Sequence, residues 1–416
     1  MNKSRFKYKG NNLYVEGVSV EKIAKKIGTP VYVYSESYFH DQLSMLKKAF
    51  KKASVLICYS LKVCHNVNVI KSFVEKGCGL DIVSGGELYR GIKAGIDPKK
   101  IIYSGVAKTT KEIREAIQTG ILMFNVESEQ ELDRINKIGG EKGGKVPIAI
   151  RVNPNVDAQT HPHITTGMEK NKFGIDHSLI MNIYKKAKNL SNIEIVGIDC
   201  HIGSQILDIK PFRDAIKIIA RYTKELQRDG INIKYVDVGG GLGIPYKDSD
   251  RVISCKEYAN AVTKPFKGMD IMFILEPGRF LTASAGVLIA EVQYTKENSA
   301  GKKFVIINTG MHHLIRPPLY DGFHRIIPLK RKSTNKIKVD VVGPICESTD
   351  FLARDRELEE VESGDILAIT DVGAYGMVLS SHYNSHPLPP EVLVKGSNYK
   401  IIREKETYED LLFKEV

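Results

Sequence analysis

The sequence has no long apolar run and no closely paired cysteines. None of its apolar runs approaches the roughly 20 residues that a membrane-spanning helix needs. The first residues, MNKSRFKYKGNN, lack the apolar core of a signal peptide. The cysteines form no CxxC pair, which argues against a zinc ribbon and a disulfide framework; they are Cys58, Cys64, Cys78, Cys200, Cys255 and Cys346. We therefore expect a soluble protein of a reducing, cytoplasmic compartment.

The chain also lacks a block of basic residues with interleaved aromatics. Its net charge is +12, but the lysines are scattered through helix-like segments such as KKAKNL. Nucleic-acid binding is therefore not expected. A basic surface of this kind suits an anionic small-molecule substrate or a cofactor that carries phosphate.

A regular alternation of strand and helix patterns covers residues 36–280. Short apolar, β-branched runs precede amphipathic segments, several of which end in glycine. Eight such units favour a TIM-type (β/α)8 barrel over an open sheet. The candidate strands are VLICYS, GLDIVS, IIYSG, LMFNVES, VPIAIRVNP, IEIVGIDCHIGS, YVDVGGG and MFILEPGR.

The pattern changes to β-rich stretches after residue 280. At 416 residues the chain exceeds the usual size of one core, so two domains are expected. Strand-like runs such as GVLIAEVQYTKEN and DILAITDVG follow the barrel, and LYVEG and PVYVYS precede it. We predict an α/β-plus-β fold with a barrel over 36–280. A C-terminal β domain over 281–416 would be completed by the N-terminal segment 1–35.

Residues that carry chemistry follow the predicted barrel strands, where the active sites of such barrels lie. A lysine that desolvation or neighbouring charge has made neutral can form a Schiff base with an aldehyde. Glycines let backbone N–H groups approach a phosphate, and a carboxylate can keep a pyridine nitrogen protonated. The sequence places Lys62, His201, Gly239 to Gly241, Glu276 and Arg279 at these strand ends. Together they predict a pyridoxal phosphate site.

Each of these residues also has a structural explanation. Lys62 could be solvated at the barrel rim, and GGGLG could form a simple tight turn. Glu276 before Pro277 could do no more than end a strand, and His201 could be a hydrogen-bonded core residue. Their joint occurrence at the strand ends of one barrel favours the cofactor site.

Ten motifs give the sequence a resemblance to a known family. In order they are YSLK, DIVSGGEL, RVNPNVDAQTHPHITTG with KFGI, HIGSQ, VDVGGGLGI, LEPGRFL, RPPLYDGFH, GPICESTD and DVGAYG. The chain resembles the pyridoxal-phosphate decarboxylases of the alanine-racemase-like fold from about Pro30 to Asn384, most closely the branch that acts on diaminopimelate. The resemblance implies a barrel with a C-terminal β domain. It also implies a homodimer with active sites at the subunit interface.

The resemblance assigns roles to individual residues. Lys62 would carry pyridoxal 5′-phosphate as a Schiff base, and His201 would stack on its ring. Cys346 would be the proton donor, delivered from the neighbouring subunit. The lysine motif departs from the family's Ala-Asn by continuing with Val63 and Cys64, which puts only local packing in doubt.

The remaining roles concern binding of the cofactor and the substrate. Phosphate would bind to Ser204 and Gly239 to Gly241, the pyridine nitrogen to Glu276, and the cofactor also to Gly278, Arg279 and Tyr375. The distal carboxylate of the substrate would bind to Arg279, Arg316 and Tyr320, its distal amino group to Glu347, and Tyr375 would touch both phosphate and substrate.

The expected reaction is decarboxylation of meso-2,6-diaminopimelate to L-lysine and carbon dioxide, the last step of lysine biosynthesis. Two arginines favour a substrate with a distal carboxylate, because a planar guanidinium can bind one bidentately. The alternatives are decarboxylation of ornithine, arginine, lysine or carboxynorspermidine. A racemase and a non-catalytic pyridoxal phosphate binding protein are also alternatives.

Two histidine pairs, His161 with His163 and His312 with His313, suggest a metal site. Neither comes with the carboxylate or cysteine partners that zinc or iron needs, so we expect solvated or loop histidines and no metal. Thr165 to Gly167 could form a loop over the substrate.

Overall fold

The computed structural model describes residues 5–158, 166–167, 171–332 and 335–416. His161, His163 and Thr165 lie outside the described residues. The chain forms two compact units. The barrel unit comprises Leu43–Ile244 and Arg251–Phe280, and the β unit comprises Met1–Gln42, Pro245–Asp250 and Leu281–Val416.

The barrel unit contains a closed ring of eight parallel strands. β13 pairs with β5, and β8 pairs with β9, so the sheet has no open edge between first and last strand. The short strand β10 (Ile175–Asp176) adds to β9. This arrangement confirms the predicted (β/α)8 barrel. The ring strands are β5 (Val55–Ser60), β6 (Gly79–Ile82), β7 (Ile101–Tyr103), β8 (Met123–Val126), β9 (Val146–Asn153), β11 (Ile193–Asp199), β12 (Tyr235–Asp237) and β13 (Met272–Leu275).

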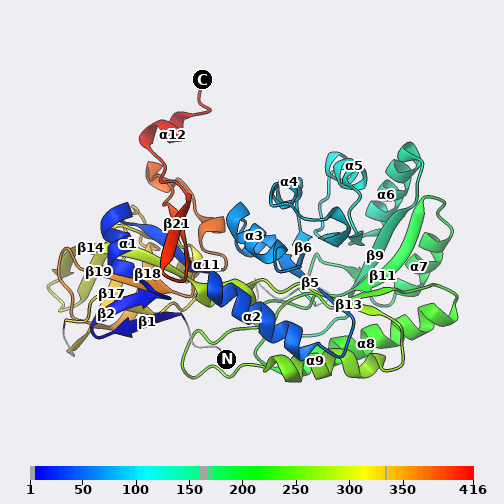
Figure 1. Cartoon of the computed structure of the whole chain (residues 1–416), viewed down its shortest axis with the longest axis horizontal. Helices are drawn as coiled ribbons and strands as arrows, with labels where there is room; N and C mark the ends of the chain where they lie inside the picture. Colours follow the sequence, from blue (N-terminus) through cyan, green and yellow to red (C-terminus); the bar gives the residue numbers. More distant parts are fainter. Residues whose placement is uncertain (1–4, 159–165, 168–170, 333–334) are drawn as a thin grey trace. The chain divides into compact units, whose positions relative to one another are not determined.

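Helices alternate with these strands and surround the ring (Figure 1). Many begin at a serine or threonine whose hydroxyl accepts a backbone N–H of the first turn, as Ser84, Thr109 and Ser254 do. Apolar side chains such as Ile102, Met123 and Ile274 fill the ring interior. The helices are α3 (Val67–Val74), α4 (Gly85–Lys93), α5 (Thr110–Thr119), α6 (Glu129–Lys142), α7 (Ile180–Lys188), α8 (Ile209–Arg228) and α9 (Cys255–Thr263).

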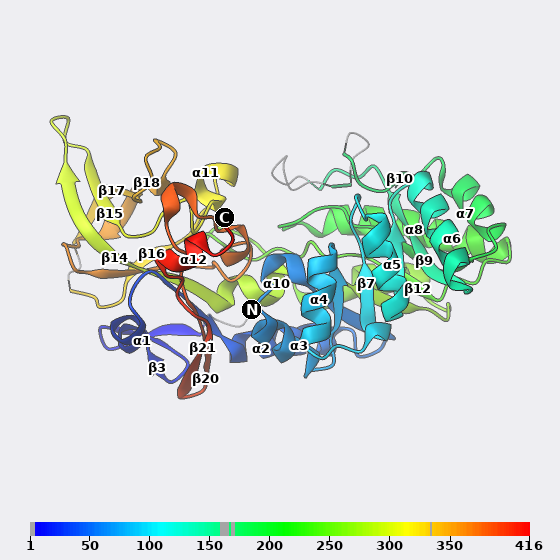
Figure 2. The same ribbon diagram turned by 90° about the horizontal axis from the view of Figure 1, so that it is seen from above.

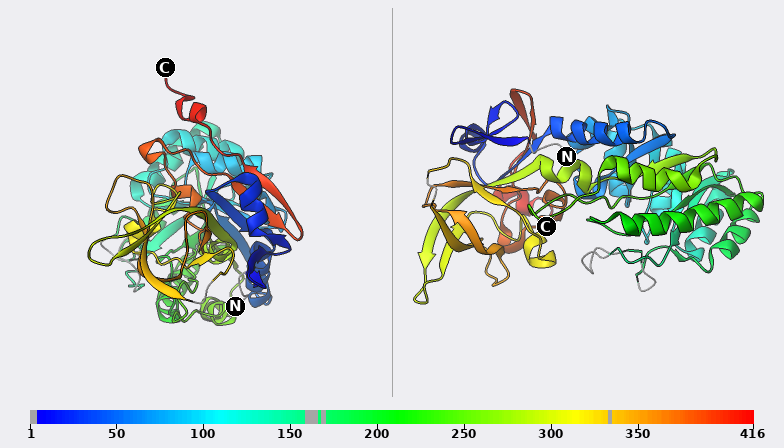
Figure 3. Two further views of the ribbon diagram at one scale, coloured as in Figure 1. Left: turned by 90° about the vertical axis from the view of Figure 1, so that its left-hand side faces the viewer. Right: turned by 90° about the horizontal axis from the view of Figure 1, so that it is seen from below.

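The β unit is built on a mixed sheet that includes the N-terminal segment. β4 (Val31–Ser35) lies between β14 and β20, antiparallel to β14 and parallel to β20. The blue N-terminal and red C-terminal strands therefore lie side by side in Figures 2 and 3. This confirms that the N-terminal segment completes the β domain. The other main strands are β14 (Gly286–Glu297), β15 (Lys303–Ile307), β16 (Ile326–Pro328), β17 (Lys336–Val342), β18 (Phe351–Glu359), β19 (Ile366–Thr370), β20 (Glu391–Lys395) and β21 (Asn398–Arg403).

Smaller elements complete the chain. Three short strands, β1 (Phe6–Lys9), β2 (Asn12–Val15) and β3 (Val18–Ser19), form a separate sheet. The remaining helices are α1 (Val20–Ile27), α2 (Glu36–Ala49), α10 (Arg279–Thr282), α11 (Arg316–Tyr320) and α12 (Tyr408–Leu412). Over the described ranges, no helix combines the length and apolar character needed to cross a membrane.

Candidate functional site

Lys62 lies directly after β5, in a single 3-10 turn (Leu61–Val63). Its ammonium nitrogen is 2.6 Å from Oδ2 of Asp81, which belongs to the neighbouring strand β6. The Asp81 side chain is fully buried and also accepts the hydroxyl of Ser60 at 2.7 Å. The Lys62 side chain is 33% exposed. The amine is therefore oriented by a buried carboxylate while it stays accessible at the strand end.

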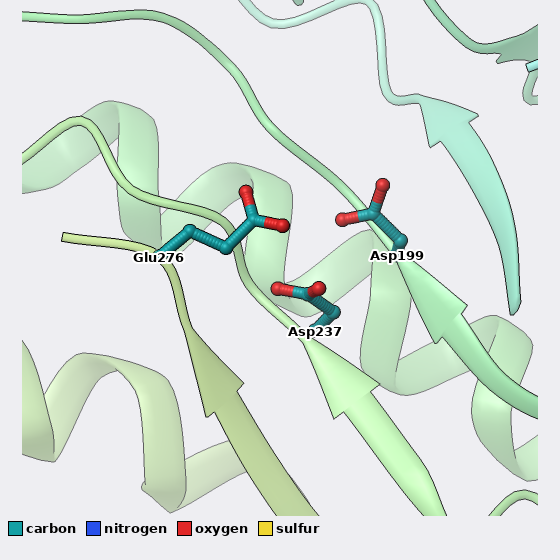
Figure 4. A group of neighbouring side chains, drawn as sticks. All are labelled: Asp199, Asp237 and Glu276. Carbon is teal, nitrogen blue, oxygen red and sulfur yellow. The ribbon is translucent and has the colours of Figure 1, made fainter. Parts of the chain in front are cut away.

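Three further carboxylates meet at the ends of adjacent strands. Asp199 ends β11, Asp237 ends β12, and Glu276 follows β13. Their side chains point toward one another (Figure 4), with one oxygen of each within 4.8 Å of the others. Burial raises the pKa of Glu276 to about 7, and the charge of Asp81 adds to this effect. Burial and the charge of Glu276 also raise the pKa values of Asp199 and Asp237 well above their ordinary range.

Neighbouring donors partly compensate this cluster of acids. Nε of Arg151, on β9, is 3.9 Å from Oδ2 of Asp199, and its Nη1 donates to Glu127 at 2.5 Å. The side-chain amide of Asn125 donates to Asp237 at 3.1 Å. The guanidinium of Arg151 beside Asp199 disfavours a second cation at this cluster. A Glu276 carboxyl with a pKa near 7 is suited to contact a ring nitrogen that itself exchanges a proton.

His201 lies next to this cluster, with its Nδ1 4.0 Å from Glu276 Oε2. Nδ1 accepts the backbone N–H of Gly240 at 3.1 Å, so the proton of the neutral ring lies on Nε2. Burial lowers the pKa of His201 well below its usual value, and the cations Arg151 and Lys62 act in the same direction. A neutral imidazole is the form that suits stacking on an aromatic ring.

The glycine turn after β12 is tied to the carboxylates. The N–H of Gly239 donates to Asp237 at 2.9 Å, as that of Gly240 does to His201. Gly239 and Gly241 have positive φ values of 65° and 100°, a backbone conformation that L side chains rarely adopt. The N–H groups of Gly239 and Gly240 therefore make hydrogen bonds within the site itself. The phosphate contacts expected of Gly239 to Gly241 stay a prediction.

A second group of donors lies at the same ends of the barrel strands. The guanidinium of Arg279 donates to the hydroxyl of Ser204 at 3.0 and 3.3 Å. Gly278, just before Arg279, packs so closely that a Cβ there would clash with the side chain of Val63. The barrel unit therefore brings together an accessible amine, a carboxyl for a ring nitrogen, a neutral imidazole, and an arginine with a hydroxyl for an anion. This donor set fits pyridoxal phosphate.

The other predicted site residues belong to the β unit. Arg316 and Tyr320 are the first and last residues of α11. Cys346 and Glu347 lie in the turn between β17 and β18, where the N–H of Cys346 donates to Asn384 Oδ1 at 3.1 Å. The hydroxyl of Tyr383 lowers the pKa of Glu347 by donating a hydrogen bond.

Tyr375 is half-buried in the turn that follows β19, with φ of 57°. Five of the six cysteines are buried, and Cys346 is exposed. It is therefore the thiol that can reach a ligand or another chain.

Several residues of this arrangement were not predicted. Asp81, Asp199 and Asp237 each stand within an otherwise apolar strand, which was an available signal because buried charges need partners. His312 and His313 were expected to be solvated or loop histidines, and they lie in a turn of the β unit. They are not solvated, because they are 1% and 3% exposed, with ring centroids 3.7 Å apart.

Comparison with known proteins agrees with this site. The pyridoxal binding domain of the pyridoxal-dependent decarboxylases matches residues 37–283. A diaminopimelate decarboxylase of Aquifex aeolicus (strain VF5) is 48% identical over 402 residues, which cover 97% of this chain and 95% of the relative.

Solved structures give the same result. A diaminopimelate decarboxylase from Helicobacter pylori complexed with L-lysine is 39% identical, with a TM-score of 0.91 and coverage of 94% of this chain and 98% of that one. Another from M. jannaschii, also with L-lysine, is 39% identical, with a TM-score of 0.94 and coverage of 99% and 97%. The chain therefore belongs to the pyridoxal-dependent decarboxylase family, among its diaminopimelate decarboxylases.

Proposed function

We propose that this protein removes carbon dioxide from meso-diaminopimelate and forms L-lysine, with pyridoxal phosphate as its cofactor. The observation that carries the proposal is the position of Lys62 beside Asp81, on the barrel end that also holds Glu276, His201 and Arg279. Near full-length similarity to diaminopimelate decarboxylases supports the choice of substrate.

Pyridoxal phosphate, when bound, supplies an aldehyde that joins to an amine and a ring that accepts the electron pair left by departing carbon dioxide. Lys62 would hold the cofactor, and Asp81 would orient its amine. Glu276 would face the ring nitrogen and His201 the ring. Arg279 and Ser204 would bind anionic groups of the cofactor and substrate, as the arginine and hydroxyl chemistry allows.

Substrate recognition would come largely from the β unit. Arg316 and Tyr320 would grip the distal carboxylate, Glu347 the distal ammonium, and Tyr375 would touch phosphate and substrate. The distal L-centre would be the end that is recognised, so the D-centre reacts. Cys346 would then deliver a proton to the carbon that has lost its carboxylate.

The thiol of Cys346 would serve the active site of a second copy of the chain. We infer a homodimer in which each site takes this residue from the partner subunit. We also infer that residues 36–280 form the cofactor domain, and that 1–35 and 281–416 form the β domain. The six cysteines form no disulfide among the described residues, which supports a reducing, cytoplasmic location.

Product analysis tests this proposal. The holoenzyme should convert meso-diaminopimelate to L-lysine with equimolar carbon dioxide and no D-lysine. Lys62→Ala should abolish product formation. D-lysine as the product would mean that the L-centre reacts, and no lysine at all would reject the assigned substrate.

A further inference from the structure

His324 is a buried histidine that none of the roles above uses. It follows Arg316 by eight residues, and the chain turns back between them at Asp321, which has a left-handed φ of 49°. The backbone N–H of Gly322 donates to the carbonyl of Arg316 and closes this turn at 3.2 Å. His324 is 0% exposed, and Arg316 is 6% exposed. The turn therefore places an imidazole against a predicted substrate-binding guanidinium.

The hydrogen bonds of His324 fix its tautomer. Its Nδ1 is 2.8 Å from the backbone carbonyl of Thr370, which can only accept, so Nδ1 carries the proton. Its Nε2 is 2.8 Å from Nη1 of Arg316, and a guanidinium can only donate, so Nε2 accepts. The ring is therefore neutral and links strand β19 to the guanidinium of Arg316.

Other contacts hold this link in place. Arg356, on β18, donates to the backbone carbonyl of His324 at 2.7 Å. The ring of Tyr246 packs edge-on against His324 with centroids 5.7 Å apart, and it lies 4.9 Å from the guanidinium carbon of Arg316. The guanidinium is thus held by an acceptor and by the face of an aromatic ring. Burial raises the pKa of Asp371, which follows Thr370, and the nearby charge of Arg316 partly offsets this rise.

A flexible arginine loses side-chain entropy when it binds a ligand, and an arginine already fixed in its bound orientation loses less. A guanidinium carries five N–H groups, so the bond to His324 occupies only one of them. Fixing Arg316 in this way favours ligands with a carboxylate at the matching position. It gives no advantage to a ligand without one.

We propose that His324 is a positioning residue that sets the preference for a distal carboxylate by fixing Arg316. This inference rests on the proposed function and deepens it. It predicts that loss of the Nε2 acceptor weakens ligands that carry the carboxylate and leaves others unchanged. L-Lysine keeps the carboxylate of the distal centre, whereas 1,5-diaminopentane has the same chain and amines without it.

Two matched amide variants separate the two hydrogen bonds of the ring. The amide of His324→Asn ends near the position of Nδ1, so it can still donate to Thr370 but does not reach Arg316. The longer His324→Gln places its amide oxygen near the position of Nε2 and can still accept from Arg316. Both are small, polar changes, so a difference between them reports on the acceptor and not on burial of a polar group.

The dissociation constants of L-lysine and 1,5-diaminopentane should be measured on each holoenzyme by titrating the absorbance of the cofactor. For His324→Asn we expect L-lysine to bind about tenfold or more weakly, the range of a lost charge-assisted hydrogen bond. Binding of 1,5-diaminopentane should change less than about twofold, and His324→Gln should restore most L-lysine affinity. The KM for meso-diaminopimelate should rise in His324→Asn by about the same factor as the dissociation constant of L-lysine. The change in kcat should be smaller.

Two results would overturn the proposal. One is an unchanged ratio of the two affinities in His324→Asn, which includes equal weakening of both ligands. The other is failure of His324→Gln to restore L-lysine binding. Activity of the unmodified holoenzyme separates this inference from the proposed function. If that enzyme does not decarboxylate meso-diaminopimelate, the proposed function fails. If it does and the ratio stays unchanged, only the role of His324 fails.

Discussion

Asp81 holds the amine of Lys62 at 2.6 Å across the adjacent ends of strands β6 and β5. The carboxylate is fully buried, whereas the lysine is partly exposed. A buried acceptor of this kind fixes the direction of the amine without hiding it from a ligand. The contact with Asp81 therefore explains why the charged residue Lys62 can stand at the end of the apolar strand β5.

Asp81→Asn should slow decarboxylation by about tenfold to a hundredfold, because it removes a charge-assisted hydrogen bond to the lysine. The cofactor should still bind, since Lys62 remains. Steady-state kinetics of the holoenzyme check this, with Asp133→Asn as the control. Asp133 contacts Lys186 at 2.7 Å, but both side chains are at least one-third exposed, and such pairs contribute little. Equal rates in the two variants would contradict the role of Asp81.

The contribution of Glu276 to the stability of the cofactor-free protein should fall as pH rises from 5 to 8. Glu276 has a pKa of about 7 when folded and about 4.3 when unfolded, so the folded state binds the proton more tightly. Its contribution is fully present below the unfolded pKa and is lost as pH rises through 7. Urea midpoints at both pH values measure this loss. Glu276→Gln should reduce the loss, and an equal loss in the variant would refute the assignment.

Alkylation should modify Cys346 before any other cysteine, because the other five are buried. Iodoacetamide followed by peptide mass spectrometry locates the label. Cys346→Ala should slow product formation by at least about tenfold while the cofactor absorbance stays unchanged, since a general acid contributes a hundredfold or more in typical enzymes. Cys255→Ala is the control and should leave the rate unchanged. An unimpaired Cys346→Ala enzyme would remove this thiol from the mechanism.

Asp350→Ala should destabilise the turn that carries Cys346. The Asp350 carboxylate accepts the N–H of Met311 at 2.6 Å and that of Ile345 at 2.7 Å. Two buried N–H groups without an acceptor cost about 1 to 3 kcal/mol each, so the midpoint of thermal unfolding should drop by several degrees. Glu362→Ala, an exposed acid, should have no such effect. A midpoint unchanged in Asp350→Ala would show that these hydrogen bonds are not needed.

The barrel was predictable because its strands are buried on both faces and read as short apolar runs. VLICYS corresponds to β5 without a shift, and MFIL to β13. The position of β4 between β14 and β20 was not predictable in detail. Those pairings join segments more than 250 residues apart, and no local pattern encodes such a register.

The sequence predicts which site residues follow each strand, but not the contacts that these residues make with one another. Lys62, His201 and Glu276 each follow a predicted strand, so the barrel places them together. The contact of Glu276 with Asp237 depends on how the ring closes, and that of Arg316 with His324 depends on one tight turn. Neither follows from spacing in the sequence. The buried state of His312 was missed because two adjacent polar rings usually indicate an exposed loop.

Carbon dioxide release from four amino acids, each offered alone, tests whether the enzyme selects a substrate with a distal carboxylate. The holoenzyme should be offered meso-diaminopimelate, L-lysine, L-ornithine and L-arginine separately at equal concentration. We predict release from meso-diaminopimelate alone, because only this substrate presents a second carboxylate to Arg316. Release mainly from L-ornithine, L-arginine or L-lysine would show that Arg316 does not select for a distal carboxylate and would contradict the proposed substrate.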